Sequence, residues 1–476
     1  MTFSPPQADC EAVLRRRHAG VWPLGTVHGG TVPALVLSFQ QSKEISSSVE
    51  MECVMGKMQL CVFEDSTAGN FNPLVYLRPV FELRCGHTRL FEKIQLTYPD
   101  AEPTYLVRDY LKRVTVERLG APVNDVEGLA DEALFVNGRY LDFGEQDFSG
   151  TGEEAGVCEN GVVYVRARKE SVLKHAEVAP EELVEKLAAD LPQKKLDVKL
   201  LSYPWNLIHH NPEAIVNDFK RLGKSGVAGK MHEMSCVYGP EDQVYVAPSA
   251  RIEPFVVIDT HGGPVIIDED AVVNPHTRIE GPSCVGKGAH LVGAKIREGT
   301  SIGPVCRVGG EVEESIMHAY SNKYQDGFLG HSYVCEWVNL GALTSNSDLK
   351  NDYSSVEVYL NGVLTDTGDT KVGSFIGDHT KASMGCLLNT GTIIGVMNNL
   401  VNHGSFFPKF ISSFLWIMSG RPIKGAGIAS MINLAKTVMS RRKVEMTDAE
   451  AMLIRHVFER TRAERTEIIK RARELS

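Results

Sequence analysis

The sequence predicts an α/β domain, then a left-handed parallel β-helix made of hexapeptide repeats, then a C-terminal helical tail. Three patterns indicate these folds. Strand-like and helix-like segments alternate over residues 58–235, apolar residues recur every six positions over 244–403, and helical periodicity marks 404–476. We take these three ranges as the predicted domains, and residues 1–57 as a separate leader.

The six-residue period predicts the β-helix. A short strand every six residues sends one side chain inward from each side of a triangular coil, and stacked coils bury a continuous apolar column. The alternative is an ordinary β domain whose residues match the period by chance. The period lapses between Val308 and Phe328 and again from Leu340 to residue 376, so we expect two excursions from the coils. The predicted inward positions are Ile267, Val273, Ile279, Val285, Leu291, Ile296, Ile302, Val308, Ile376, Ala382, Leu388, Ile394 and Leu400.

The region 58–235 alternates between strand and helix patterns. Such alternation is typical of a layered α/β domain with a mostly parallel sheet. Ligands of these sheets bind beyond the carboxyl ends of the strands, so functional residues are expected there. The predicted strands are 59–63, 104–107, 133–136 and 162–165, and the predicted helices are 109–119, 181–191 and 212–222.

Composition limits the class of protein. The chain has 476 residues, of which 43% are hydrophobic, enough for two or three domains with buried cores. A net charge of -10 argues against a nucleic acid partner, which binds to a basic surface. Ten cysteines lack C-x-x-C and C-x-x-H spacings and predict reduced thiols in a cytoplasmic protein. The apolar run 410–418 is too short to cross a bilayer, so we expect no membrane partner.

Residues 1–57 show no sustained helical or strand period and contain a basic cluster at 15–18. The first convincing strand starts directly after Met58. We therefore expect the folded protein to begin at Met58, after a leader that is disordered or results from an upstream mis-start. A basic regulatory arm is the alternative.

The loop after the first strand is a candidate phosphate site. It contains Gly69 and is followed by Arg78 and Arg84. Backbone N–H groups and guanidinium groups in such a loop can bind phosphate oxygens. The alternative is that the two arginines pair with acidic neighbours such as Glu64 and Glu82.

The segment from Leu60 to Gly86, above all Pro73-Leu74 and Arg78-Pro79-Val80-x-Glu82-Leu83-Arg84-x-Gly86, resembles the opening of the divergent GlmU-type sugar nucleotidyltransferase family. That family joins a Rossmann-like nucleotidyltransferase domain to a left-handed β-helix acyltransferase domain, and the resemblance spans residues 58 to 465. It implies that a nucleoside triphosphate and a sugar 1-phosphate react, with Mg²⁺, to a nucleotide sugar of the UDP-N-acetylglucosamine or dTDP-glucose type. It also implies acyl transfer from acetyl-CoA to an amino sugar, a homotrimer and a role in cell envelope biosynthesis.

The nucleotidyltransferase motifs depart from the family pattern. The family's glycine-rich loop is reduced to Gly69, and Arg78 stands where its lysine is expected. Arg139 occupies the position of the aspartate that holds Mg²⁺, a role that needs a hard oxygen ligand, so Asp65 becomes the candidate metal ligand. Asn206 replaces the acid of a Trp-Asp-Leu segment. The candidate substrate and phosphate ligands of this domain are therefore Arg78, Arg84, Gly69, Asn137 and Asn206.

The acyltransferase motif also departs from the family pattern. Acyl transfer to an amine needs a base, and aligning Leu329-Gly330 with the family motif places Gln325 at the base position. Glutamine cannot accept a proton, which leaves His331 as the best base and Asp326 as the second. The alternative for His331 is a surface or stacking histidine. Further candidate ligands are Lys323, Asn339 and Lys350, for which solvated lysines and a structural asparagine are the alternatives.

The C-terminal tail predicts helices at 427–440 and 447–474. Thr447 and Glu450 form a capping box, which satisfies free N–H groups at a helix start. An apolar stripe follows on one face of the second helix, so we expect it to pack on the β-helix or on a neighbouring subunit.

Two other functions stay open from the sequence. One is a monofunctional acyltransferase whose front domain only binds a nucleotide sugar. The other is a non-catalytic β-helix assembly protein, because Gln325, Arg139 and Asn206 all replace expected chemical groups.

Overall fold

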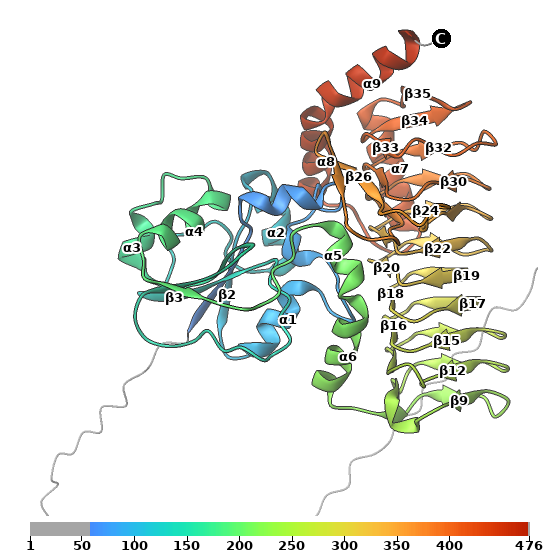
Figure 1. Cartoon of the computed structure of the whole chain (residues 1–476), viewed down its shortest axis with the longest axis horizontal. Helices are drawn as coiled ribbons and strands as arrows, with labels where there is room; N and C mark the ends of the chain where they lie inside the picture. The colour runs from blue at the N-terminus through green and yellow to red at the C-terminus, as the bar shows by residue number, and fades with distance from the viewer. Residues whose placement is uncertain (1–57, 475–476) are drawn as a thin grey trace, which may run out of the picture. The chain divides into compact units, whose positions relative to one another are not determined.

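The computed structural model describes residues 58–474, which contain an α/β front domain, a β-helix and three C-terminal helices (Figure 1). These residues belong to a single structural unit. The leader predicted over 1–57 lies outside the described residues, so the structure does not test it.

The front domain is built on a six-stranded sheet of order β2-β1-β3-β5-β4-β6. β1 pairs in parallel with β2 and β3, as predicted, whereas β5 is antiparallel to both β3 and β4. The sheet is therefore mixed. Its strands are β1 (Gln59–Phe63), β2 (Glu102–Leu106), β3 (Glu132–Asn137), β4 (Glu154–Cys158), β5 (Gly161–Arg168) and β6 (Gln193–Lys195).

Helices cover both faces of this sheet. Leu60 and Val62 of β1 join one apolar core, and Cys61 and Phe63 join the core on the opposite face, because side chains alternate along a strand. The helices are α1 (Leu90–Thr97), α2 (Lys112–Leu119), α3 (Lys169–Leu173), α4 (Pro180–Ala189), α5 (Pro204–His209) and α6 (Asn211–Leu222), with 3₁₀ turns at Ser66–Phe71, Val80–Glu82 and Asp109–Leu111.

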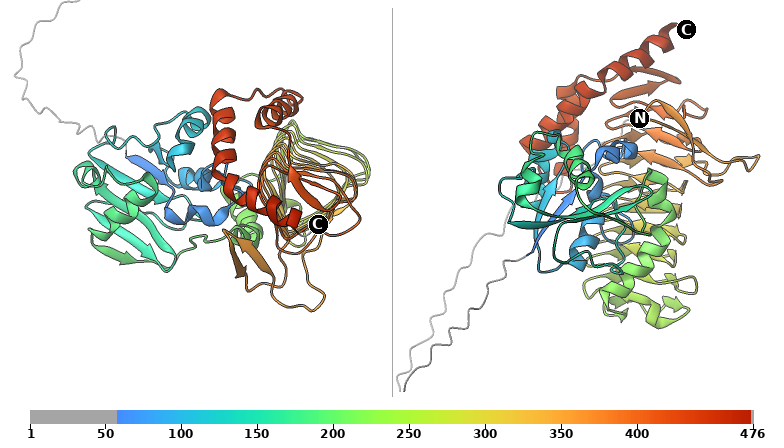
Figure 2. Two further views of the ribbon diagram at one scale, coloured as in Figure 1. Left: turned by 90° about the horizontal axis from the view of Figure 1, so that it is seen from above. Right: turned by 60° about the vertical axis from the view of Figure 1, so that its left-hand side comes forward.

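The second domain is a parallel β-helix, which confirms the predicted fold class. A typical coil takes 17 or 18 residues, since Val265 pairs with Ser283 and Ser283 pairs with Thr300. Other coils differ, with 15 residues between Ser301 and Ile316 and 21 between Val244 and Val265. Three sides per coil give the six-residue period, and the left-hand view of Figure 2 shows the coils almost superimposed. One side is a sheet of β7 (Gly226–Val227), β10 (Val244–Val246), β13 (Val265–Ile267), β16 (Ser283–Val285), β18 (Thr300–Ile302), β20 (Ile316–Met317), β23 (Tyr333–Val334), β28 (Ser374–Ile376), β31 (Thr392–Ile394) and β33 (Phe410–Ile411).

The other sides contain the remaining coil strands, and a 3₁₀ turn lies at Glu241–Gln243. The coils thus begin at β7 and continue to β34, beyond both ends of the predicted range 244–403. The strands are β8 (Lys230–Met231), β9 (Cys236–Tyr238), β11 (Arg251–Ile252), β12 (Val257–Asp259), β14 (Val272–Val273), β15 (Arg278–Glu280), β17 (His290–Ile296), β19 (Arg307–Glu313), β21 (Asn322–Lys323), β22 (Phe328–Gly330), β24 (Asn339–Leu340), β25 (Ser345–Asn346), β29 (Lys381–Ala382), β30 (Leu387–Leu388), β32 (Asn399–Leu400), β34 (Leu415–Met418) and β35 (Arg421–Lys424).

The column inside the coils is apolar, and every inward position predicted from the period is buried in it. The residues that alternate with them face outward. Ile316, Tyr333, Phe375 and Ile393 point away from the column and form one core with the front domain. The apolar face that receives the front domain is thus made by alternate residues of the same strands.

The prediction of a first excursion, between Val308 and Phe328, is wrong. The coil continues there in register, since Val308 pairs with Lys323 and Glu311 pairs with Phe328. The period lapses because Lys323 occupies an inward position. Its ammonium group donates hydrogen bonds to the carbonyl oxygens of Gly309 at 2.9 Å and Gly327 at 2.5 Å, and burial lowers the pKa of Lys323 to about 8.

The second predicted excursion is present but shorter. The coil continues through β25, where buried Asn346 exchanges hydrogen bonds of 2.9 Å with the backbone of Gly330. Residues 347–372 then leave the column and form the hairpin of β26 (Glu357–Leu360) and β27 (Val363–Asp366) before β28 resumes the coil. We call residues 347–372 the excursion.

The C-terminal tail forms α7 (Ile428–Ser440), α8 (Asp448–Arg460) and α9 (Arg462–Glu474). The predicted capping box is present, because the Thr447 hydroxyl accepts a bond from the Glu450 N–H at 3.1 Å and the Glu450 carboxylate accepts one from the Thr447 N–H at 3.0 Å. Apolar residues of α8, such as Ile454 and Val457, join a core that the front domain shares with Val396 and Phe414 of the β-helix.

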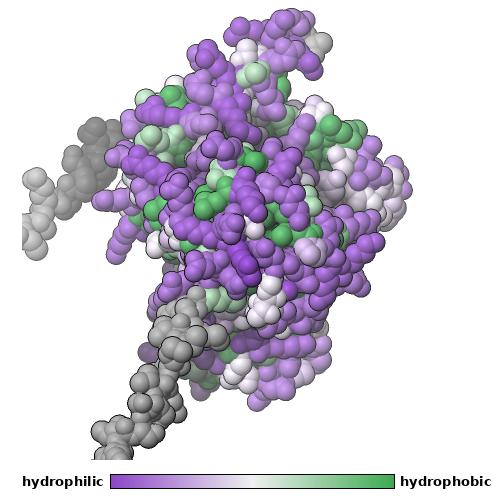
Figure 3. Space-filling model, turned by 90° about the vertical axis from the view of Figure 1, so that its left-hand side faces the viewer, coloured by the Kyte–Doolittle hydropathy of each residue, from purple (hydrophilic) through white to green (hydrophobic). Residues whose placement is uncertain are grey.

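The helices of residues 58–474 include none with the length and hydropathy that a bilayer span requires. Figure 3 shows the face on the left of Figure 1, which is largely hydrophilic with small, separate hydrophobic patches.

Candidate functional site

A buried ion pair lies at the carboxyl edge of the front-domain sheet. Asp65 follows β1, and Arg139 follows β3. The Arg139 Nε donates to Asp65 Oδ1 at 3.0 Å and the Arg139 Nη2 donates to Asp65 Oδ2 at 2.5 Å. Asn137 donates to the same Oδ2 at 2.7 Å, and the Thr67 hydroxyl donates to Oδ1 at 2.8 Å. Both carboxylate oxygens are therefore occupied by protein donors.

These contacts do not fit the predicted role of Asp65 as a Mg²⁺ ligand. Burial alone would raise the pKa of Asp65, but the hydrogen bonds and charge of Arg139 hold it below its usual range. The carboxylate is thus ionised and its charge is already neutralised by a guanidinium. Arg139 takes the place of a cation here, and Asn137 contacts both members of the pair, since it donates to Asp65 and accepts a bond of 2.9 Å from the Arg139 N–H.

A second buried pair lies beside the first. Arg108 follows β2 and binds Glu64 through two hydrogen bonds of 2.8 and 3.0 Å, in the bidentate geometry that makes guanidinium–carboxylate pairs strong. Glu64 also accepts a bond of 2.7 Å from the N–H of Val80. Arg108 is not among the residues predicted from the sequence, although a charged residue directly after a predicted strand is a usable signal.

Arg78 lies at the contact between the two domains. Its guanidinium is buried and forms ion pairs with Asp378 and, at 3.5 Å, with Glu336, both on the β-helix. Neither partner is among the acidic neighbours considered from the sequence. This position does not fit the predicted contact with phosphate.

Arg84 also binds the β-helix. Its Nε donates to the carbonyl oxygen of His318 at 3.3 Å, and its backbone N–H donates to the Tyr333 hydroxyl at 2.9 Å. The Arg84 Nη1 additionally donates to the carbonyl oxygen of His87. The two arginines of the family-like segment therefore dock the front domain on the β-helix.

Gly69 and Asn206 have structural contacts. The carbonyl oxygen of Gly69 accepts a bond of 3.0 Å from Asn361, at the tip of the β26–β27 hairpin. The Asn206 side chain accepts bonds from the N–H groups of Ser202 and Tyr203 at 3.1 and 2.9 Å, and so caps α5. An amide serves this capping role as well as an acid does.

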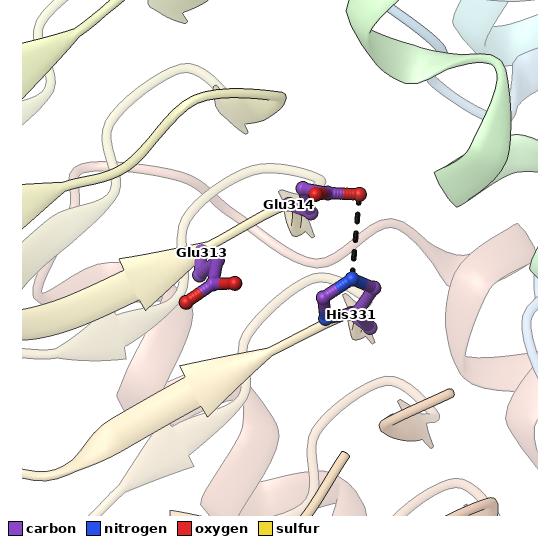
Figure 4. Close-up of side chains that lie close together, drawn as sticks. All are labelled: Glu313, Glu314 and His331. Atoms are coloured by element: carbon purple, nitrogen blue, oxygen red, sulfur yellow. Dashed lines mark ion pairs between the residues drawn. The ribbon is translucent and has the colours of Figure 1, made fainter. Parts of the chain in front are cut away.

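His331 lies on the β-helix between two carboxylates. Its Nδ1 is 2.8 Å from Asp348 Oδ2, and its Nε2 is 3.3 Å from Glu314 Oε2, as Figure 4 shows for the second contact. Burial alone would lower the pKa of His331, but the hydrogen bonds and charges of Asp348 and Glu314 raise it to about 9. An imidazole engaged at both nitrogen atoms is not a free base at neutral pH.

The other residues predicted for acyl transfer lie in separate places. Gln325 and Asp326 are exposed on a corner between β21 and β22, whereas Lys323 is inside the column. Asn339 accepts a bond of 3.3 Å from Asn322 in the neighbouring coil, and Lys350 donates to the Ser355 carbonyl at 2.6 Å inside the excursion. These contacts therefore do not bring the residues predicted for acyl transfer together in one site.

The structure thus combines an α/β domain that has a charged sheet edge with a parallel β-helix. Residues 60–226 match the family model described as sugar nucleotidyl transferase. The front domain is thus a sugar nucleotidyltransferase domain, and the predicted resemblance to the GlmU-type family is confirmed.

Two curated relatives match the chain in part. A bifunctional sugar-1-phosphate nucleotidylyltransferase/acetyltransferase from Sulfurisphaera tokodaii is 29% identical over 165 residues, which cover 30% of this chain and 39% of the relative. A bifunctional protein GlmU from Nitratidesulfovibrio vulgaris is 26% identical over 210 residues, which cover 39% of this chain and 43% of the relative. The chain therefore matches less than half the length of each.

Solved structures show weaker likenesses. A UDP-N-acetylglucosamine acyltransferase is 13% identical to this chain. The match covers 44% of this chain and 77% of the acyltransferase chain and gives a TM-score of 0.24. The UDP-N-acetylglucosamine acyltransferase of Francisella novicida is 12% identical. That match covers 50% of this chain and 90% of the Francisella chain and gives a TM-score of 0.20. TM-scores of this size are too low to support an argument about function.

Proposed function

We propose that this chain is a sugar-1-phosphate nucleotidyltransferase joined to a β-helix acyltransferase. The observation that carries the proposal is the carboxyl edge of β2, β1 and β3, where two ion pairs fix four charged groups inside a domain of the sugar nucleotidyltransferase family. In α/β proteins with parallel strands, substrates bind at this edge of the sheet.

The proposed reaction is an in-line displacement at phosphorus. A phosphate oxygen of the sugar 1-phosphate forms a bond to the α-phosphorus of a nucleoside triphosphate, the bond to the β-phosphate oxygen breaks, and pyrophosphate leaves. The product is a nucleotide sugar of the UDP-N-acetylglucosamine or dTDP-glucose type. Such reactions need alignment and fixed charges more than covalent chemistry from the protein.

The buried pairs act here as positioning groups. Glu64 and Asp65 both belong to the loop that follows β1, and Arg108 and Arg139 bind this loop to β2 and β3 respectively. The loop is thereby fixed where the family places its phosphate-binding loop. Asp65 does not fit a Mg²⁺ ligand, because both of its oxygens accept hydrogen bonds from the protein, and its part in the proposed reaction is to hold this loop.

For the β-helix half, we propose transfer of an acetyl group from acetyl-CoA to an amino sugar. The neutral amine attacks the thioester carbonyl carbon, the carbon–sulfur bond breaks, and the proton lost by the amine nitrogen passes to the departing sulfur, so that coenzyme A leaves as the thiol. The name of the Sulfurisphaera relative supports this proposal. His331 does not fit the base, because both of its ring nitrogens are engaged.

We further propose that the chain works as a homotrimer in the cytoplasm, where nucleotide sugars for the cell envelope are made. Clefts between neighbouring β-helices would then hold acetyl-CoA.

Pyrophosphate release tests the first activity. The purified chain is incubated with each nucleoside triphosphate and a set of hexose and hexosamine 1-phosphates, with and without Mg²⁺. We expect release with one pair of substrates. Binding of a UDP-sugar or dTDP-sugar without pyrophosphate release would support the front domain as a binding module of a monofunctional acyltransferase.

Thiol release tests the second activity. The chain is incubated with acetyl-CoA and glucosamine 1-phosphate, and the free thiol of coenzyme A is measured. We expect release that depends on the amino sugar. If neither assay shows turnover and no nucleotide sugar binds, the non-catalytic assembly protein becomes the better description.

A further inference from the structure

Three potential metal ligands converge on one corner of the β-helix. Glu313 ends β19, Glu314 follows it, and His331 follows β22 in the next coil. The backbone N–H of His331 donates to the Glu313 carbonyl oxygen at 3.1 Å, which holds the two corners together. One ligand atom from each residue lies within 4.8 Å of the others (Figure 4). We propose that Glu313, Glu314 and His331 form a site for a divalent transition metal, with Zn²⁺ the best match.

The spacing of the ligand atoms supports tetrahedral coordination. Zinc binds imidazole nitrogen and carboxylate oxygen at about 2.0–2.1 Å, so two ligand atoms of a tetrahedral site lie roughly 3.4 Å apart. The distance between His331 Nε2 and Glu314 Oε2 is 3.3 Å. These two atoms can therefore share an ion without moving apart once Nε2 has released the proton that it shares with Glu314. The Glu313 carboxylate has to turn from Lys371 and Arg297, whose side chains are 44% and 37% exposed and are free to move aside.

Asp348 supplies the support that a metal-binding histidine needs. Metal-bound histidines commonly donate their other ring N–H to a carboxylate, which fixes the ring orientation and the tautomer. Here the second nitrogen, Nδ1, lies 2.8 Å from Asp348 Oδ2. Nε2 is then directed at the two glutamates. The His331 side chain is 5% exposed, so packing also holds the ring in place.

The charged residues around the cluster favour one type of metal ion over another. Lys371 contacts Glu313 at 3.1 Å, and Arg297 lies 3.7 Å from the same carboxylate. These cations reduce the negative charge of the cluster, so a weakly held hard cation such as Mg²⁺, which prefers six oxygen ligands, is disfavoured. A mixed nitrogen and oxygen set with three protein ligands suits Zn²⁺ and leaves a fourth position open.

The site also has a consequence for the fold. Asp348 lies at the start of the excursion and Lys371 lies near its end, so both ends of this segment meet the cluster. A bound metal would fix the ends of the excursion to the coils of Glu314 and His331. This inference is independent of the proposed transferase activities, because none of them is assigned to these residues.

Calorimetric titration of the full chain tests the site. The chain is treated with a chelator, dialysed and titrated with ZnCl₂ and, separately, with MgCl₂. We expect one Zn²⁺ per chain and no measurable Mg²⁺ binding. Asp348→Asn should weaken Zn²⁺ binding by roughly 10–100-fold, the effect usual for supporting carboxylates, and Glu314→Gln should weaken it at least as much.

Glu311→Gln is the matched control, because Glu311 lies on the same strand and contacts Arg297 and Lys295 rather than His331. It should leave Zn²⁺ affinity unchanged. Titration with Co²⁺ adds a spectroscopic readout, since tetrahedral Co²⁺ gives intense visible bands and octahedral Co²⁺ gives weak ones. Circular dichroism checks that each variant is folded.

Several results would overturn the inference. They are the absence of Zn²⁺ binding to the parent chain, an octahedral Co²⁺ spectrum, and equal affinity in Glu314→Gln and Glu311→Gln. The last result would identify an adventitious ion only.

Discussion

Asp65 and Arg139 form a buried ion pair, so each charge is compensated only while the other residue is present. Removing one partner of a buried ion pair leaves an uncompensated charge and costs about 3–5 kcal/mol. We therefore expect Asp65→Ala to lower the free energy of unfolding by about that amount, measured by urea denaturation. The double variant Asp65→Ala with Arg139→Met should recover much of the loss, because it removes the stranded guanidinium. Equal stability of parent and Asp65→Ala would show that this pair does not hold the loop.

At the residue scale, the sequence located the charged groups but not their partners. Arg139 is predicted to occupy the position of the family's metal-binding aspartate, but its pairing with Asp65 was not predicted. Arg78 was considered with nearby acidic residues, whereas its partner Asp378 lies 300 positions later in the chain. Pairings of this kind depend on how two domains dock, and no local pattern reports that.

At the scale of elements, the β-helix was predicted in most detail. Each predicted inward side chain is buried, because a strict period of six is imposed by the geometry of the coil. The errors come from two polar residues at inward positions. Lys323 and Asn346 break the apolar pattern, but their side chains satisfy backbone groups inside the coils, so the coils continue through both. Hydropathy alone cannot distinguish such a residue from an excursion.

The buried Lys323 should make the stability of the β-helix depend on pH. Its pKa in the folded protein is lowered to about 8, below the ordinary value of 10.5. The unfolded chain thus binds the proton more tightly, so stability rises as pH increases from about 8 towards 10.5. Between about pH 8 and pH 10 we expect the parent to gain about 2 kcal/mol relative to Lys323→Met.

Urea denaturation of both proteins across this pH range measures the difference. Comparing the two proteins cancels the contributions of other groups that titrate at high pH. A difference that stays constant with pH would mean that the ammonium group of Lys323 is better solvated than its position in the column indicates.

At the scale of the whole molecule, the front domain and the β-helix share a buried polar contact centred on His318. The Tyr333 hydroxyl accepts a bond from the Arg84 N–H and lies 2.9 Å from His318 Nδ1, to which it can donate. Burial, followed by the charges of nearby guanidinium groups, lowers the pKa of His318 well below 6.5. The groups that face it are Tyr333 and Glu336 on the β-helix and Arg78, Arg84, Arg89 and Arg118 on the front domain.

Acid should therefore weaken the contact between the domains. Because the folded pKa is depressed, the contribution of His318 is present above about pH 6.5 and is lost as the pH falls. At about pH 5.5 the parent should lose about 1.4 kcal/mol more than His318→Gln, measured by urea denaturation at that pH and at about pH 7.5. Equal acid sensitivity of the two proteins would assign the pH dependence to other groups.

The proposed trimer can be tested at a row of exposed apolar side chains. Tyr324, Leu343 and Met384 follow the neighbouring strands β21, β24 and β29, so they line one corner of the column. Leu343 and Met384 are 63% and 70% exposed. A contiguous apolar row on a rigid column is typical of an interface, and a threefold ring of identical chains would bury it.

We expect light scattering coupled to size exclusion to give three times the chain mass for the parent. Replacing Leu343 and Met384 together by lysine should shift the protein to the monomer, because six charges would be buried in each trimer. Leu364→Lys is the control, since Leu364 is 53% exposed on the β26–β27 hairpin, away from this corner. A parent that is monomeric at assay concentrations would contradict the trimer, and a trimer that survives both lysines would place the interface on another side of the column. In the monomer, acyl transfer should fall while pyrophosphate release persists, because only the acetyl-CoA cleft requires two columns.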